Sequence, residues 1–111
     1  MIFNKKDIIA FSQQFDAGEI ENESSLDFAL SYAKTTTAWT KALAYIVRAI
    51  LTGHVFQEGN KRTSALLIMS EFDRKALSYK PSDVASLVKK IVIKNIKSTK
   101  QIKEMIENAI S

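Results

Sequence analysis

Residues 38–77 read AWTKALAYIVRAILTGHVFQEGNKRTSALLIMSEFDRKAL and decide the fold, because two helix-like stretches flank one polar loop. Apolar side chains recur at the three- and four-residue intervals of an α-helix with one buried face. We therefore expect two central helices, at about residues 38–52 and 60–77. Their apolar stripes comprise Trp39, Leu43, Ile46, Val47 and Ile50 in the first helix, and Leu66, Leu67, Met69 and Phe72 in the second.

The helical period continues on both sides of this region. Glycine and proline are scarce, with 3 and 1 copies, which favours helices over a loop-rich β architecture. The 111 residues suit one domain, residues 1–111, and we expect an all-α fold of five or six helices around one core. The outer stripes are Leu26, Ala29, Leu30 and Ala33, then Val84, Leu87, Val88, Ile91 and Val92, and finally Ile102, Met105, Ile106 and Ala109.

Polar residues indicate where helices begin. A short polar side chain answered three residues later by an acid or amide has the spacing of a capping box. Pro81 suits a first helical turn. The segment Asp16-Ala17-Gly18 is typical of a turn, and the run Thr35–Thr37 suits an extended segment or a cap better than a helix centre. Three pairs have the capping-box spacing: Asn4 with Asp7, Ser24 with Asp27, and Ser98 with Gln101.

The composition excludes several classes of protein. The chain has no cysteine, so no disulfide framework or cysteine-based metal site is possible, and a cytoplasmic protein is expected. The N-terminal MIFNKKDIIAF lacks the apolar run of a signal peptide, and no apolar window is long enough for a membrane span. The net charge of +4 is compatible with an anionic ligand, an acidic partner or nucleic acid, or with a lysine-rich solvated surface.

The loop between the central helices gathers residues that suit phosphate chemistry. It contains His54, the only histidine of the chain, and a histidine is a natural proton acceptor at neutral pH. Gly59 before a helix lets several backbone N–H groups converge, which favours phosphate binding by Gly59, Asn60 and Lys61. Lys61 and Arg62 add positive charge. Glu58 is a hard oxygen ligand for Mg²⁺. Together they suit phosphoryl or nucleotidyl transfer.

Each of these residues also has a structural interpretation. A lone histidine before a loop is usually structural, Phe56 alone would be a core residue, and Glu58 with Arg62 could form an i,i+4 surface pair. The loop is not a Walker A motif, because Gly59 is followed by Asn60 and not by Lys-Ser/Thr. The clustering of all these residues at one helix junction favours a functional site.

The run HVFQEGNKRT resembles the signature of the Fic/Doc family, whose general form is His-x-Phe-x-Asp/Glu-Gly/Ala-Asn-Gly/Lys-Arg. Its fixed positions are met by His54, Phe56, Glu58 and Gly59 and by Asn60-Lys61-Arg62. In that family the motif is a loop between two central helices of an all-α fold, and the flanking stretches here resemble those helices. The resemblance covers residues 22–111 and extends more weakly over the first 20.

The resemblance implies a role for each matching residue. His54 would deprotonate the target hydroxyl, with Lys61 and Arg62 as further catalytic cations. Gly59, Asn60, Lys61 and Arg62 would hold the phosphates of ATP or another nucleoside triphosphate. Glu58 would bind Mg²⁺, and Phe56 would anchor the loop in the core. A short β-hairpin flap that docks the target peptide would fall within residues 31–37, at Lys34, Thr35, Thr36 and Thr37.

Three departures from the AMP-transferring branch favour the Doc-type toxin (death-on-curing) branch. The AMP-transferring branch has proline at the position of Val55, glycine at the position of Lys61, and a further arginine at the position of Ala65. Doc-type toxins resemble kinases that move the γ-phosphate to a threonine of a translation elongation factor. We therefore expect transfer of a γ-phosphate to a Ser/Thr hydroxyl of a target protein. An AMP-transferring enzyme that uses His54, Glu58 and Asn60 is the alternative.

A catalytically silent binding module is a second alternative. Six lysines near the C-terminal end of the chain could form a basic face for nucleic acid, but no aromatic residues are interleaved with them, so nucleic acid is a less favoured partner. Fic proteins are often restrained by a Ser/Thr-x-x-x-Glu helix, and the candidate Glu107 has Lys103 four residues earlier. Restraint by a separate antitoxin is therefore expected. The lysines are Lys89, Lys90, Lys94, Lys97, Lys100 and Lys103.

Overall fold

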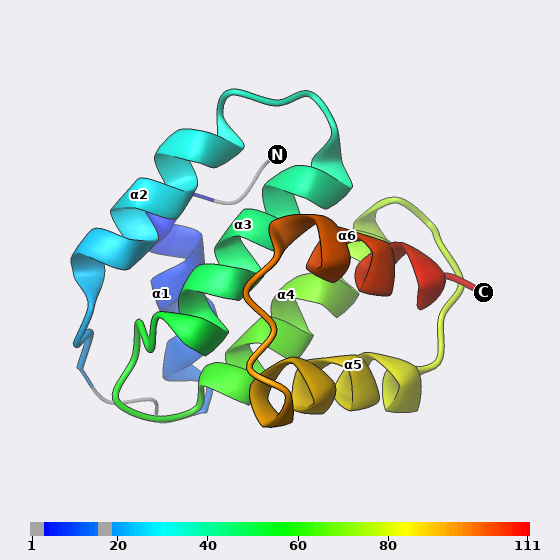
Figure 1. The fold of residues 1–111 in the computed structure, drawn as a ribbon. Coiled ribbons are helices and arrows are strands. Elements are labelled where there is room, and N and C mark those ends of the chain that lie inside the picture. The colour runs from blue at the N-terminus through cyan, green and yellow to red at the C-terminus, as the bar shows by residue number, and fades with distance from the viewer. Residues whose placement is uncertain (1–3, 16–18) are drawn as a thin grey trace.

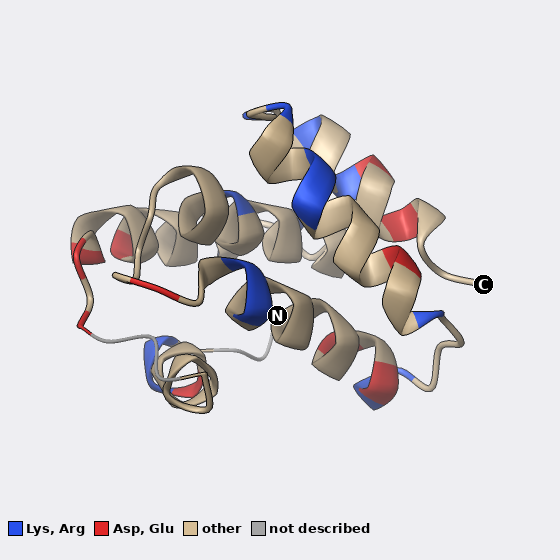
Figure 2. Cartoon of the chain, turned by 90° about the horizontal axis from the view of Figure 1, so that it is seen from below, with Lys and Arg blue, Asp and Glu red and all other residues tan. Residues whose placement is uncertain are grey.

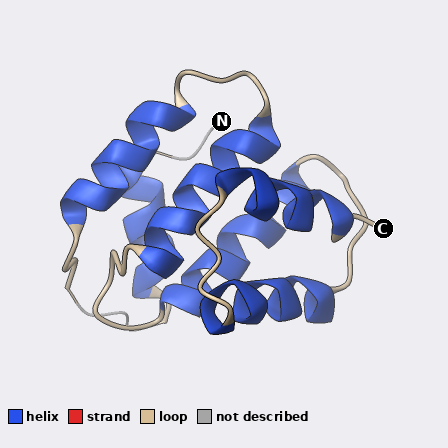
Figure 3. Cartoon of the chain, in the orientation of Figure 1, coloured by secondary structure: helices blue, strands red, loops and turns tan. Residues whose placement is uncertain are grey.

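A computed structural model describes residues 4–15 and 19–111 of the chain, and these residues form an all-α fold (Figures 1 and 3). The expected turn at residues 16–18 lies outside the described residues. None of the described helices is long and apolar enough to cross a membrane. The described helices are α1 (Lys5–Gln13), α2 (Glu23–Ala33), α3 (Trp39–Thr52), α4 (Asn60–Arg74), α5 (Pro81–Ile93) and α6 (Thr99–Asn108).

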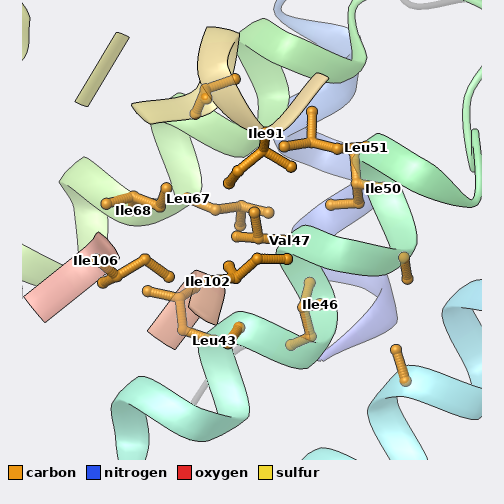
Figure 4. Close-up of a cluster of buried hydrophobic side chains, with 14 of the residues drawn as sticks. Leu43, Ile46, Val47, Ile50, Leu51, Leu67, Ile68, Ile91, Ile102 and Ile106 are labelled. Carbon is orange, nitrogen blue, oxygen red and sulfur yellow. The ribbon is translucent and has the colours of Figure 1, made fainter. Parts of the chain in front are cut away.

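Helix α3 is the centre of the fold and contacts α2, α4, α5 and α6. Its apolar stripe is completely buried at Leu43, Ile46, Val47 and Ile50, as the periodicity predicted. Figure 4 shows these side chains meeting those of α4, α5 and α6 in one cluster. Each leucine or isoleucine side chain buried in this way stabilises the fold by about 1.5–3 kcal/mol.

The periodicity misplaced a few core residues. Val92 was assigned to the stripe of α5 but is 40% exposed, whereas Ile68 of α4 is fully buried although no stripe included it. Leu66 and Met69 are half-buried. A wide apolar helix face has edges that the sequence alone does not define, so residues at its margin are the ones that pattern reasoning misassigns.

Two of the three expected helix caps are present. Asn4 and Asp7 form a complete capping box on α1, and the Ser98 side chain accepts from the Gln101 N–H on α6. The Ser24–Asp27 box was wrong, because Asn22 is the N-cap of α2 and its side chain accepts from the Ser25 N–H. Asp27 instead forms an ion pair with Lys5 of α1 at 2.9 Å, and Glu23 pairs with the same lysine.

Helix α4 ends earlier than expected, at Arg74 and not near residue 77. Ala76 adopts a left-handed backbone conformation with φ of 55°, and the Leu77 N–H donates to the Phe72 carbonyl. This is the hydrogen-bond pattern of a Schellman helix end. An alanine gives no sequence signal for such a termination.

The segment expected to form a flap contains no strand. Residues 31–33 belong to the last turn of α2, Lys34 is its C-cap, and Thr35–Thr37 form the loop to α3. The hydroxyl of Thr35 donates to the Tyr32 carbonyl, and that of Thr36 accepts from the Ala38 N–H. The threonines therefore sit at helix ends, as their type predicted, but the possible β-hairpin was wrong.

Candidate functional site

The motif loop joins the end of α3 to the beginning of α4 and is closely packed where it leaves α3. Gly53 is the C-cap of α3, and a Cβ atom at this position would collide with the Ser25 hydroxyl and the Ala49 carbonyl. The side-chain amide of Asn22 donates to the Gly53 carbonyl at 2.7 Å. The start of α2 therefore fixes the direction in which the chain enters the loop.

His54 follows directly and is exposed. Its φ of 49° lies in the left-handed region, where non-glycine residues are uncommon and histidine is among the more tolerated. The imidazole forms no hydrogen bond or ion pair with any residue that the structure describes. The ring is therefore accessible to a group from outside the chain.

Val55 and Phe56 fasten the loop to the core. Val55 is fully buried and Phe56 is 1% exposed, so both side chains pack into the core. Asn60 fixes the same point from α4, since its side-chain oxygen accepts from the Phe56 N–H at 3.1 Å and its amide donates to the Phe56 carbonyl at 2.8 Å. Both polar atoms of the Asn60 side chain are engaged in this way, so the second amide hydrogen and the backbone N–H are the Asn60 donors that remain for a phosphate.

A second segment, absent from our sequence-based site, pairs with the loop. Ile20 and Phe56 form an antiparallel β-bridge, and the Gln57 N–H donates to the Glu19 carbonyl at 3.0 Å. The Val55 carbonyl accepts from the N–H groups of Glu21, at 2.8 Å, and Asn22. Nothing in the pattern of these residues indicated the pairing, because it depends on how α1 and α2 pack beside α3.

Beyond Phe56 the loop opens into the start of α4. Gly59 is the N-cap of α4 with φ of 70° and ψ of 16°, and no side chain caps this helix. The backbone N–H groups of the first turn, at residues 60–62, have no acceptor within the helix. They therefore present partial positive charge, which favours an anion.

A pocket of about 300 Å³ lies at this helix start and is lined by Phe15 and by every residue of 58–62. Glu58, Lys61 and Arg62 are exposed, and within residues 4–15 and 19–111 none of them forms an ion pair. The surface pair between Glu58 and Arg62 that the spacing allowed is therefore absent. Both cations remain available to a ligand.

No group of three or more His, Asp or Glu side chains that could hold a metal ion occurs in the described parts of the chain. Among the lining residues that the structure describes, Glu58 is the single carboxylate of this pocket. Mg²⁺ in nucleotide sites is commonly held by one or two carboxylates together with phosphate oxygens, so this donor set fits a nucleotide-bound ion.

The expected flap residues lie far from the loop. Lys34–Thr37 precede the first residue of α3 and His54 follows the last, and a helix of 14 residues is about 20 Å long. The structure therefore does not bring the flap and the motif together. Glu107 likewise contacts the far end of α3, where it accepts from the Thr40 hydroxyl at 2.8 Å, so it does not pair with Arg62.

The motif loop thus brings together an exposed imidazole, two cations without an ion pair to any described residue, and an uncapped helix start. No protein-family model matches the chain, and neither a curated protein nor a solved structure matches it.

Proposed function

We propose that this protein is a Fic/Doc-type transferase of the Doc-like branch, which moves the γ-phosphate of a nucleoside triphosphate to a Ser/Thr hydroxyl of a target protein. The observation that carries the proposal is the arrangement of the loop. An exposed histidine precedes an uncapped helix start with two unpaired cations, and buried residues hold the loop between them.

The pocket at the start of α4 supports phosphate binding. The N–H groups of residues 60–62 and the side chains of Lys61 and Arg62 supply positive charge from several directions. Glu58 would hold Mg²⁺, which when bound neutralises charge on the phosphate oxygens. Asn60 contributes by positioning, because its side chain fixes Phe56 and so keeps His54 and Gly59 in register.

His54 is the proton acceptor in this mechanism. The target hydroxyl gives its proton to the imidazole, its oxygen forms a bond to the γ-phosphorus, and the bond from that phosphorus to the bridging oxygen breaks. The products are a phosphorylated side chain and a nucleoside diphosphate. The imidazole then releases the proton to water.

Lys61 and Ala65 support γ-phosphate transfer over AMP transfer. Both residues line an apolar groove of about 270 Å³ between α4 and α5, beside Arg62. Lys89 of α5 also lines this groove, so an arginine at position 65 would add a fourth cation, and such a clamp suits a long phosphate chain. With alanine there, Lys61 and Arg62 are the cations that can neutralise a transferring phosphoryl group.

A paired labelling experiment tests the proposal. The protein, His54→Ala and the matched loop control Gln57→Ala are each incubated with cell lysate, Mg²⁺ and ATP labelled at the α- or the γ-phosphate. We expect one γ-labelled protein with wild type and Gln57→Ala and none with His54→Ala. An α-labelled protein would move the chain to the AMP-transferring branch, and no label of either kind would overturn the transferase proposal.

The same proposal includes a cytoplasmic location and a partner antitoxin. Glu107 is engaged by Thr40 and by Lys103, so it is not available to restrain Arg62 in the described structure. Restraint by a separate protein remains the arrangement we favour. Co-expression of a candidate antitoxin tests this point, because a true one would abolish labelling and restore growth.

A further inference from the structure

Three aromatic side chains form a surface cluster on the outer side of α2 and α3. Phe28 is 64% exposed and Tyr32 is 43% exposed, which is unusual for such large rings. The Phe28 and Tyr32 ring centroids are 4.7 Å apart in an edge arrangement, and Tyr45 lies 5.5 Å from Tyr32. No described residue forms a hydrogen bond with either tyrosine hydroxyl. Tyr45 is half-buried and packs against the core, whereas the Phe28 and Tyr32 rings lie outside it.

Cations face this cluster across a pocket of about 410 Å³. The pocket is bounded by α2, α3, the loop after α5 and the start of α6, and its cationic lining residues are Arg48, Lys97 and Lys100. The Arg48 Nε–H donates to the Lys97 carbonyl at 2.6 Å, so this arginine holds the loop beside the rings. No Asp or Glu is among the lining residues, and no ion pair neutralises these cations within the described structure.

Further cations lie on the neighbouring helix α5 and just after it. Lys89, Lys90 and Lys94 are exposed on the second half of α5 and just after it. Figure 2 shows blue positions on α5, on α6 and around the loop that joins them. No aromatic residue is interleaved with the lysines in the sequence, but the fold brings Phe28, Tyr32 and Tyr45 of α2 and α3 to the same pocket as Lys97 and Lys100.

We infer that this surface, which we call the aromatic–cationic pocket, binds single-stranded nucleic acid. Bases stack on exposed rings and phosphates pair with lysine and arginine in sequence-tolerant single-strand sites. Here the base is received by Phe28 and Tyr32, and the adjoining phosphates by Arg48, Lys97 and Lys100. An acidic peptide would satisfy the cations but would leave the exposed ring faces without a partner. A duplex would keep its bases stacked within itself.

The inference is independent of the proposed transferase activity, because none of the pocket residues belongs to residues 54–62. It assigns the molecule a second ligand surface on α2, α3 and α6. The binding experiment below therefore includes His54→Ala, a variant that should lose transferase activity but keep nucleic-acid binding.

Fluorescence anisotropy with a labelled oligouridylate of about ten nucleotides tests the inference. We expect Phe28→Ala and Tyr32→Ala each to weaken binding about tenfold, and Phe28→Trp to preserve it. Lys97→Ala and Lys100→Ala should weaken binding and each reduce the salt dependence of the logarithm of affinity by about 0.7. Two controls, Ile93→Ala and Lys80→Ala, should not change the affinity; the Ile93 side chain is apolar and 69% exposed. His54→Ala should bind the oligonucleotide as tightly as wild type does.

Phe28 and Tyr32 are exposed enough that their removal should leave the fold intact, and circular dichroism on each variant verifies this. Binding that is unaffected by loss of the rings would overturn the inference. So would equal affinity for duplex RNA. Displacement of the oligonucleotide by polyglutamate at equal charge would assign the surface to an acidic protein partner, and absence of wild-type binding would reject it outright.

Discussion

His54 combines a strained backbone with an unsatisfied side chain. A left-handed conformation costs an L-residue roughly 1–2 kcal/mol, and glycine would end α3 at less cost. Strain of this kind persists where the surroundings impose it, and here Gly53 and Val55 on either side are fixed by Asn22 and by the core. The histidine is thus placed where stability alone would favour another residue.

Replacing His54 should therefore separate stability from activity. We expect His54→Gly to be more stable than His54→Ala by about 1 kcal/mol, because glycine accepts a φ near 50° without strain whereas alanine does not. Both variants should lose phosphate labelling. Urea unfolding measures the first effect and the labelling assay the second. Equal unfolding midpoints for the two variants would show that the backbone at this position carries no strain.

The motif predicts a phosphate-binding role for Asn60, but in the structure its side chain binds the backbone of Phe56. Its side chain satisfies both backbone groups of Phe56, so Asn60→Ala leaves a half-buried N–H and carbonyl unpaired, and we expect a loss of about 1–3 kcal/mol in unfolding free energy. The aspartate of Asn60→Asp can still accept from the Phe56 N–H but cannot donate to the Phe56 carbonyl. Its unfolding free energy should therefore lie between those of wild type and Asn60→Ala. Gln57→Ala, an exposed neighbour in the same loop, serves as the control. If all three behave alike, the Asn60 bridge is not a stabilising contact.

At the scale of elements, the start of α2 is coupled to the end of α3. The Asn22 side chain both caps α2 and binds the Gly53 carbonyl. We expect Asn22→Ala to lower the unfolding free energy by about 1–2 kcal/mol, and Ser24→Ala, at the position that the sequence had favoured, to stay within about 0.5 kcal/mol. Chemical denaturation of both variants checks the difference. A larger effect at Ser24 than at Asn22 would restore the original cap assignment.

The helices themselves could be predicted because their signals are local. Periodic apolar residues gave the core of α3, and the Asn4 and Ser98 caps act within three residues of chain. The Asn22 cap was missed because its second partner, Gly53, lies 31 residues away. The end of α4 was missed because Ala76 takes a left-handed conformation for which its sequence offers no reason.

In the candidate site, too, the local features could be predicted from the sequence and the contacts between distant segments could not. The residue types at 54–62 could be read from the sequence, and so could the burial of Phe56. The pairing of residues 19–22 with the loop could not, nor could the separation of Lys34–Thr37 from His54, because both depend on the packing of α1 and α2 against α3. Contacts between distant segments are set by the whole core, which no local pattern encodes.

At the scale of the whole molecule, the excess of 16 Lys and Arg over 12 Asp and Glu is unevenly distributed. Among the described residues, the ion pairs engage Lys5, Arg74, Lys75 and Lys103. The cations at the start of α4 and around the aromatic–cationic pocket have no such carboxylate partners. These cations therefore add positive charge to the two surfaces for which we propose anionic ligands.

Among the described residues, the core contains one buried carboxylate, that of Glu71. Glu71 of α4 is 1% exposed, neither carboxylate oxygen is hydrogen-bonded, and Arg74 and Lys75 approach only to 3.6 and 3.9 Å. Removing a buried, loosely paired carboxylate while keeping side-chain volume is often neutral or stabilising by about 1–4 kcal/mol. Arg74 and Lys75 reach solvent, so they lose little when their partner is removed.

We therefore expect Glu71→Met to raise the thermal unfolding midpoint, because the side chain would fill the same space without desolvating a charge. In a domain stabilised by only about 5–15 kcal/mol, a gain of that size is large enough to measure. Glu104→Met, on the exposed side of α6, is the matched control and should change little. A lower midpoint for Glu71→Met would mean that attraction to Arg74 and Lys75 outweighs the cost of burying the carboxylate, and that the cations of α4 help to hold the core together.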